Sequence, residues 1–407
     1  MSLDNFRLEK IEFLGIPIIS KIVHDLGLKS ILEKSLQSHG NQKVSTTNCL
    51  LVLIANIILG RSPLYKIPAW AKGVNLKSII GQDNLDLSDD QLGRALDNLQ
   101  NLDHSSLITE IIRNVISVFN VDLKQMRNDS TTIKAYGRYP TPSDKGLEFK
   151  YGHSKDHRPD LRQILFSLTL SDDGMIPMHY KCYSGNVTDD KTHIETWNFL
   201  RDLAQKNDFW YIADCKVCTE DQLTYITGQG GRVITLVPGP WKEVKDFKND
   251  LRNGKAGTKT EIYRRRIPGS WHGDEYFSVY DRECSSYKNG HRIYWIYSSE
   301  KKKRDRETRD AQLLKAEKMV GELLPRINRG KLRDKQNIIQ KIDEILTQTK
   351  TEGLFHVDIR QTSEEETKIY SVAIARNQSM IKRERRTDGV FPLLAAGGRI
   401  SAKAALK

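Results

Sequence analysis

The sequence predicts an α/β protein built on a mixed β-sheet, with a helical domain before the sheet and an α+β insertion within it. Apolar residues recur at helical spacing up to about residue 120. From residue 121 the spacing changes to that of strands, and the later strands alternate with helices. The predicted parts are a helical N-terminal domain over residues 1–120, a first part of the core over 121–240, an insertion over 241–386 and a return to the core over 387–407.

The N-terminal domain has the pattern of several amphipathic helices. Isoleucines and leucines recur every three or four positions between Ile11 and Leu26. The apolar run Cys49–Gly60 is too short to span a membrane and contains an asparagine, so it predicts a buried helix. Ser88 is followed three residues later by a glutamine, which is the spacing of a capping box at a helix start. A last helix covers the apolar positions of residues 107–116.

Strand patterns open the core. One strand leads into Asp129, and residues 164–170 form a second strand. Asp173-Gly174 is a turn signal that joins the second strand to a third over residues 175–180. We expect these three consecutive strands to pair antiparallel.

Helices and strands then alternate. Thr192 precedes a glutamate by three residues, which again is the spacing of a helix start. Phe209–Ala213 is apolar throughout, as in a strand buried on both faces. Thr219 caps the next helix, and residues 233–237 form another buried strand. Three strands, helix, strand, helix, strand is the order of a mixed core of the ribonuclease H-like kind.

The insertion has a different pattern. Residues 241–300 are predicted to be rich in strands, and two helices follow over 305–347 with a break near Pro325. A short pair of strands ends the insertion. Residues 390–394 then resume the core, and Ser401 has the position of a helix cap.

The charge balance limits the kind of partner. Lysine and arginine exceed aspartate and glutamate, so that the formal net charge is +12. A surplus of this size favours a polyanion such as nucleic acid, because basic side chains release counterions when they bind phosphates. Five cysteines in 407 residues are too few for a disulfide framework, and residues 1–10 lack the apolar segment of a signal peptide. We expect a cytoplasmic protein that is not bound to a membrane.

Two aspartates carry the predicted chemistry. Asp129 lies in Asn128–Thr132, and Asp214 follows the apolar strand 209–213. If the two strands are neighbours, both carboxylates can hold divalent cations that clamp the attacking and leaving oxygens of a phosphodiester. Mg²⁺ or Mn²⁺ suits such a site, since hard ions take oxygen ligands and keep several waters. An Asx turn at Asp129 is the alternative interpretation.

Short motifs are spread over nearly the whole chain: Ser88–Leu96, Asn128–Thr132, Tyr151–Leu161, Gly174–Pro177, Gly185-Asn186, Ile212–Asp214 and Arg386–Gly389. Together they resemble those of the DDE transposases of bacterial insertion sequences, in the branch whose ribonuclease H-like core carries an inserted domain. The resemblance implies cleavage of DNA at the transposon end and transfer of its 3′-hydroxyl to target DNA. It further implies transposon terminal repeats and target DNA as partners, a homo-oligomer in the synaptic complex, and a nucleoid-associated location.

In that family two aspartates and a glutamate bind the metal ions, and Asp129 and Asp214 match the two aspartates. The glutamate belongs to a helix after the strand 390–394, and the helix that opens at Ser401 holds none. Glu365, Glu366 and Asp388 precede that strand, so none of them takes the role. The third acid is therefore not present in this chain, and we expect a truncated protein with impaired strand transfer.

Basic residues near the expected site are candidates for contacts with DNA phosphates. For each of them a solvated loop or helix face is the alternative interpretation. The candidates are Lys150, His153, Lys155, His157, Arg158, Arg162, Lys382, Arg383, Arg385 and Arg386. Cys215 and Cys218 have the spacing of a redox pair or of half a zinc site, but partly buried thiols are the favoured interpretation.

Two other functions stay open at this point. A chain that keeps its DNA-binding parts and lacks the third acid is a non-catalytic DNA-binding remnant of a transposase. A ribonuclease H-like nuclease would cleave DNA without joining it. The helical N-terminal domain is expected to recognise transposon ends in an active transposase and in a DNA-binding remnant.

Overall fold

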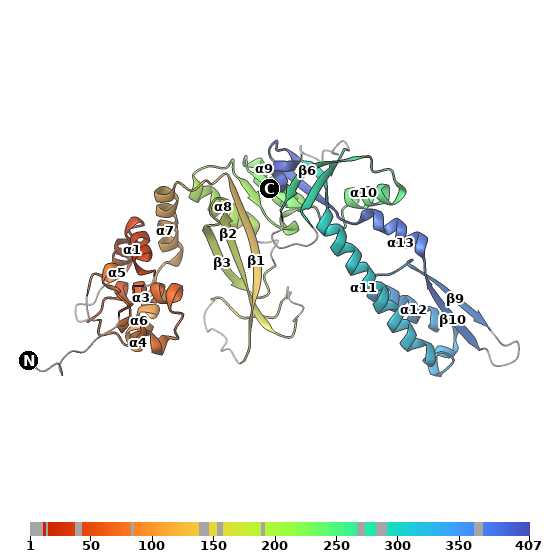
Figure 1. Ribbon diagram of the computed structural model, residues 1–407, viewed down its shortest axis with the longest axis horizontal. Coiled ribbons are helices and arrows are strands. Elements are labelled where there is room, and N and C mark those ends of the chain that lie inside the picture. Colours follow the sequence, from red (N-terminus) through yellow and green to blue (C-terminus); the bar gives the residue numbers. More distant parts are fainter. Residues whose placement is uncertain are drawn as a thin grey trace, which may run out of the picture. The chain divides into compact units, whose positions relative to one another are not determined.

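The computed structural model describes residues 11–13, 15–36, 43–82, 85–137, 146–152, 158–188, 192–266, 273–281, 291–361 and 369–407 (Figure 1). The chain divides into two compact units. The first unit comprises Met1–Lys150, Asp160–Gly185 and Asn198–Lys206, and the second comprises Tyr151–Pro159, Asn186–Trp197 and Asn207–Lys407.

Within the described residues, nine strands form a mixed sheet in the order β3-β2-β1-β4-β5-β11-β8-β7-β6. β1 pairs antiparallel with β2 and β2 with β3, whereas β4 and β5 are parallel. The first five strands therefore have the ribonuclease H-like order that the sequence predicts. The strands are β1 (Gln125–Ala135), β2 (Arg162–Ser171), β3 (Pro177–Ser184), β4 (Trp210–Ile212), β5 (Arg232–Leu236), β6 (Lys259–Arg265), β7 (Glu275–Tyr280), β8 (Arg292–Ser298) and β11 (Val390–Ala396).

The helical part of the first unit has a hydrophobic core of its own. The predicted buried helix is α3, and Ser45 caps it by accepting a hydrogen bond from the backbone N–H of Asn48. The predicted capping box is confirmed at the start of α6, where Ser88 and Gln91 each accept from the other's backbone N–H. The helices are α1 (Ile16–Asp25), α2 (Leu28–Ser35), α3 (Thr46–Leu59), α4 (Ile67–Lys72), α5 (Lys77–Ile80), α6 (Asp89–Gln100) and α7 (His104–Phe119).

Among the helices of the described residues, no single one is both long and apolar enough to cross a bilayer. α3 and the segment Leu64–Lys72 reach the required length and composition only together, as a pair bent by 102°.

The strands of the first unit follow the predicted hairpin. Asp173-Gly174 connects β2 to β3, and Gly174 has a φ of +72°, which glycine adopts without strain. Gly185 follows β3 where the backbone of two other segments comes close. A Cβ atom on Gly185 would lie 2.0 Å from the carbonyl oxygen of Gln163 and 2.4 Å from that of Lys150. Glycine is therefore required at this position of the Gly185-Asn186 motif.

In the second unit, α8 (His193–Ala204, shared with the first unit) and α9 (Glu220–Gly228) precede β4 and β5 as predicted. Thr219 caps α9 by accepting from the backbone N–H of Gln222. The strands predicted within residues 241–300 are confirmed by β7 and β8, but the first part of that range is not extended, because residues Lys242–Asn253 form helix α10. Its buried side chains Val244, Phe247 and Leu251 recur at helical spacing, and that period was missed.

The segment predicted as an insertion contributes strands to the sheet and also forms a hydrophobic core of its own. Its strands β8, β7 and β6 continue the sheet beyond β11. α11 (Ser299–Leu323) and α12 (Lys335–Thr349) are the two predicted helices, and they share a hydrophobic core with the antiparallel pair β9 (Phe355–Gln361) and β10 (Tyr370–Arg376). α13 (Gln378–Glu384) then leads to β11, and α14 (Ala402–Leu406) follows Ser401, which caps it as predicted.

Candidate active site

Asp129 lies in the middle of β1, opposite Leu168 of β2. The preceding Asn128 is buried, and its side-chain amide donates hydrogen bonds to Ser167 Oγ at 3.0 Å and Thr169 Oγ1 at 2.9 Å. Successive side chains of a strand point to opposite faces, so the carboxylate of Asp129 lies on the other face from Asn128, where it is exposed. Its Oδ1 accepts the backbone N–H of Ser130 at 2.8 Å. Asn128 thus fixes β1 to β2 and leaves the next carboxylate accessible.

Asp214 follows β4 by two residues and caps a short 3₁₀ turn over Cys215–Val217. Its Oδ1 accepts the backbone N–H of Lys216 at 2.9 Å, and the side chain is 42% exposed. The backbone of this position is held by β5, since the hydroxyl of Thr235 donates to the carbonyl oxygen of Asp214 at 2.7 Å. The end of the buried strand therefore presents an exposed carboxylate in a defined orientation.

His193 lies beside Asp214 and Tyr211 holds His193, and the sequence identified neither of these two side chains. His193, on the first turn of α8, has a side chain that is 4% exposed, and its Nε2 lies 3.9 Å from Asp214 Oδ1. Its Nδ1 lies 2.9 Å from the hydroxyl of Tyr211, a fully buried residue of β4. The available signal was a tyrosine inside an otherwise apolar run, because a buried phenol needs a polar partner.

Both aspartates supply oxygen atoms, which suit Mg²⁺ or Mn²⁺ in chemistry. Two protein ligands are, however, fewer than a typical metal site in a protein has. Within the ranges that the structure describes, no group of three or more His, Cys, Asp or Glu side chains is arranged to hold a metal ion. The joint site of Asp129 and Asp214 stays a prediction.

Asp388, in the Arg386–Gly389 motif, has a structural role. Its side chain is 3% exposed and both of its oxygens accept hydrogen bonds from the guanidinium of Arg309 on α11. Gly389 has a φ of +81°, its N–H donates to Asp305 Oδ2 at 2.9 Å, and a Cβ there would lie 2.6 Å from the carbonyl oxygen of Ser298. This motif fastens α11 to the start of β11, which agrees with the expectation that Asp388 is not the third acid.

The predicted DNA contacts are distributed over both units. Lys150 is paired with Glu148 at 2.6 Å, whereas Arg158 and Arg162 are exposed. On α13 and the turn after it, Lys382, Arg383, Arg385 and Arg386 are all exposed. His153, Lys155, His157, Glu365 and Glu366 lie outside the described residues.

The cysteines beside Asp214 are unpaired thiols. Burial, together with the neighbouring Cys215, raises the pKa of Cys218 to about 12. A thiol with so high a pKa stays protonated near neutral pH, whereas zinc binding and disulfide exchange need the thiolate. Cys218 is buried and Cys215 is half-buried, as the interpretation of partly buried thiols expects.

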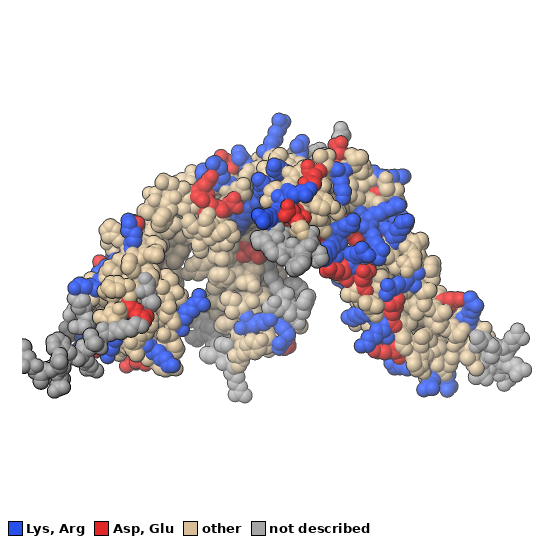
Figure 2. Space-filling model, in the orientation of Figure 1, with Lys and Arg blue, Asp and Glu red and all other residues tan. Residues whose placement is uncertain are grey.

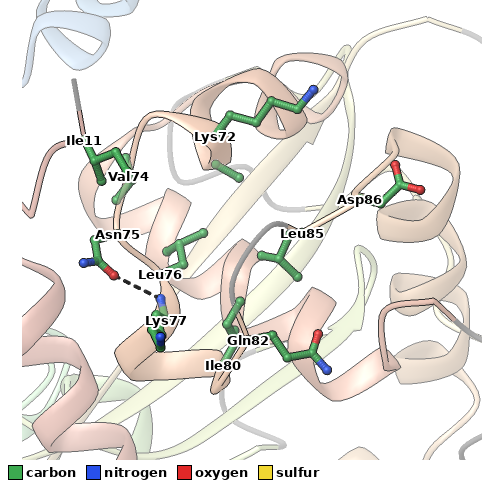
Figure 3. Close-up of a pocket in the computed structure, with 11 residues that line it drawn as sticks. Ile11, Lys72, Val74, Asn75, Leu76, Lys77, Ile80, Gln82, Leu85 and Asp86 are labelled. Atoms are coloured by element: carbon green, nitrogen blue, oxygen red, sulfur yellow. Dashed lines mark hydrogen bonds between the residues drawn. The ribbon is translucent and has the colours of Figure 1, made fainter. Parts of the chain in front are cut away.

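A cavity of about 510 Å³ lies in the helical part of the first unit (Figure 3). Its wall carries Lys72, Asn75, Gln82 and Asp86 among apolar side chains. The carboxylate of Asp86 is paired with Lys43 at 2.8 Å, and this lysine holds the pKa of Asp86 below its usual value. A single, already paired carboxylate gives this cavity no means of binding a catalytic metal ion.

Residues 6–113 match a family described as a domain of unknown function (DUF4277). No curated protein matches the chain.

Among solved structures, the chain is similar to the piggyBac transposase synaptic complex with hairpin DNA, at 10% identity and a TM-score of 0.28, with 70% of this chain and 52% of that chain covered. It is similar to the Mos1 transposase paired-end complex with the left transposon end, at 10% identity and a TM-score of 0.19, with coverages of 48% and 60%. For the Mos1 mariner paired-end complex with Mn the identity is 11%, the TM-score 0.19, and the coverages 52% and 66%. The chain thus spans less than two thirds of the length of each of these transposases.

Proposed function

We propose that the chain is a transposase for the cleavage of DNA at the ends of an insertion sequence and for the transfer of those ends to target DNA, with Mg²⁺ or Mn²⁺ as cofactor. Asp129 and Asp214 would be the metal ligands. Transposon terminal repeats and target DNA would be the partners, in a complex that contains more than one copy of the chain. Its place in the cell would be with the bacterial chromosome.

The observation that carries this proposal is the position of the two aspartates in the order of strands. Asp129 lies on β1 and Asp214 directly follows β4, and β1 and β4 are neighbours in that order. Two accessible carboxylates on neighbouring strands are the minimum that a site for phosphodiester chemistry requires. The net charge of +12 gives independent support for a polyanionic substrate.

The residues around Asp214 would orient that carboxylate before any substrate binds. The N–H of Lys216 fixes Oδ1, and Thr235 fixes the backbone. His193 is held by the hydroxyl of Tyr211 and lies beside the same oxygen, so it limits the rotation of the carboxylate. When bound, a divalent ion would polarise the phosphate and stabilise charge on the attacking and leaving oxygens.

The shared site can be tested without any catalytic activity. Fe²⁺ occupies many magnesium sites, and with ascorbate and peroxide it generates hydroxyl radicals that cut the polypeptide close to the ion. We expect cuts near residues 129 and 214, identified by mass spectrometry of the fragments. Asp129→Asn should remove both sets of cuts, and so should Asp214→Asn, because each variant removes one ligand of a common ion.

Asp221→Asn is the matched control, since Asp221 is an exposed aspartate on the first turn of α9 and belongs to no predicted site. Its cutting pattern should equal that of the unmodified chain. Cuts near residue 214 that persist in Asp129→Asn would show that the two carboxylates hold no common ion. Binding of duplex DNA should remain within about twofold in all three variants, since none changes a phosphate contact.

A further inference from the structure

A basic surface lies on α10, on α13 and on the turn Arg385–Thr387, which contact one another in the second unit. Figure 2 shows lysine and arginine side chains gathered over this part of the molecule. We call it the α10–α13 surface and define it by five exposed residues: Lys242, Lys245, Lys382, Arg383 and Arg386.

α10 separates its charges into two stripes. Lys242, Lys245 and Arg252 recur at helical spacing along one side of its buried face. The acidic residues of α10 follow one another at the same spacing along the other side; they are Glu243, Asp246 and Asp250. Arg252 pairs with Glu384 of α13 through two hydrogen bonds of 2.7 and 3.0 Å, so the basic stripe faces α13.

The two arginines of this surface are held by neutral acceptors. Arg383 donates to the side-chain oxygen of Asn253 at 2.8 Å, and Arg386 donates to the backbone carbonyl of Arg252 at 2.8 Å. A neutral acceptor orients a guanidinium without cancelling its charge, and each guanidinium keeps further N–H donors. Such a pre-oriented fork matches the oxygens of a phosphate.

The acidic side chain within the surface is already neutralised. Glu384 lies between Arg383 and Arg385 in sequence, and Arg252 occupies both of its oxygens. Within the part of the chain that the structure describes, Lys242, Lys245 and Lys382 make no ion pair with an acidic residue. The charges of these three lysines are therefore not cancelled by an ion pair.

We infer that the α10–α13 surface binds the phosphate backbone of duplex DNA without reading its bases. This inference rests on the proposed function for the identity of the polyanion. α10 has 12 residues, and at 1.5 Å per residue it is roughly 18 Å long, which corresponds to about five phosphate steps of one strand. Flexible lysines and phosphate-matched arginines give affinity that depends on salt and little on sequence.

The test compares two triple variants of the full chain with the same change in charge. Lys245→Ala, Lys382→Ala and Arg383→Ala remove three cations of the surface. Lys331→Ala, Arg333→Ala and Lys335→Ala remove two lysines and one arginine that are exposed in the turn before α12 and at its first residue, in the same unit. Binding of a labelled duplex of arbitrary sequence is measured by fluorescence anisotropy over about 50–200 mM salt, and equal unfolding midpoints verify the fold.

We expect the surface variant to lower the slope of log affinity against log salt by about 2.7, from 0.9 for each lost phosphate contact, and the control to keep the original slope. Equal slopes in the two variants would overturn the inference, because binding would then follow net charge alone. If the unmodified chain binds no duplex, both this inference and the proposed function fail. A surface variant that binds as well as the unmodified chain, beside iron-induced cuts at 129 and 214, refutes the surface and leaves the proposed function in place.

Discussion

Asp388 and Asp214 are both aspartates at an end of a strand in the second unit, yet their surroundings differ. Asp388 precedes β11, is 3% exposed, and has both oxygens bound by Arg309. Asp214 follows β4, is 42% exposed, and contacts a backbone N–H and His193 through Oδ1. A buried carboxylate with both oxygens occupied by an arginine fixes the structure, whereas an exposed one with a single occupied oxygen can accept a cation. The surroundings of the two aspartates therefore distinguish a structural carboxylate from one that is open to a cation, although the residue type is the same.

The largest effect is expected from breaking the buried pair. Arg309→Ala leaves the buried carboxylate of Asp388 without the guanidinium that binds both of its oxygens, and removal of one partner of a buried pair costs about 3–5 kcal/mol in the free energy of unfolding. Urea denaturation followed by circular dichroism measures this loss. Glu344→Ala is the control, since it breaks the exposed pair with Lys341 and should change the stability little. An Arg309→Ala variant as stable as the unmodified chain would contradict the structural role of the pair between Arg309 and Asp388.

A smaller effect is expected beside Asp214. Tyr211→Phe removes the hydroxyl that contacts His193 Nδ1 and leaves a buried ring nitrogen without it, which costs about 1–3 kcal/mol. Tyr225→Phe, on α9, is the control because that side chain is 38% exposed and Phe keeps the ring. Both are measured by urea denaturation. If the two variants lose equal stability, the contact between Tyr211 and His193 does not hold the region of Asp214.

The sequence predicted the elements well where their period was regular. The three consecutive strands, the strand 209–213 and the caps at Ser88 and Thr219 are confirmed. Caps depend on hydrogen bonds between residues close in sequence, and strands depend on a burial pattern that short segments already show. It missed α10, whose apolar positions are spread among charged residues. It also did not foresee that β6–β8 continue the main sheet, since the pairing of strands distant in sequence leaves no local pattern.

Around the candidate site, the sequence motifs identified other residues than the contacts in the structure did. Asp214 was identified because it ends an apolar strand, but His193 lies 21 residues earlier on a helix, and only the fold brings the two together. The role of Asp388 likewise depends on Arg309, which belongs to the insertion. Sequence patterns therefore identify single carboxylates, and the packing of distant segments determines what each carboxylate can do.

The smallest change in stability is expected from Asp214→Asn, and it sharpens the comparison most. Asparagine caps a helical turn as well as aspartate does, so the N–H of Lys216 keeps an acceptor and the free energy of unfolding should change by only about 0.5 kcal/mol or less. The same substitution at Asp388 removes a buried charge from the guanidinium of Arg309 and should cost several times more. The urea midpoints of Asp214→Asn and Asp388→Asn, measured under the same conditions, compare the two losses of stability. Equal losses would mean that Asp214 is a structural residue like Asp388, because a carboxylate kept for a cation contributes little to the stability of the fold without that cation.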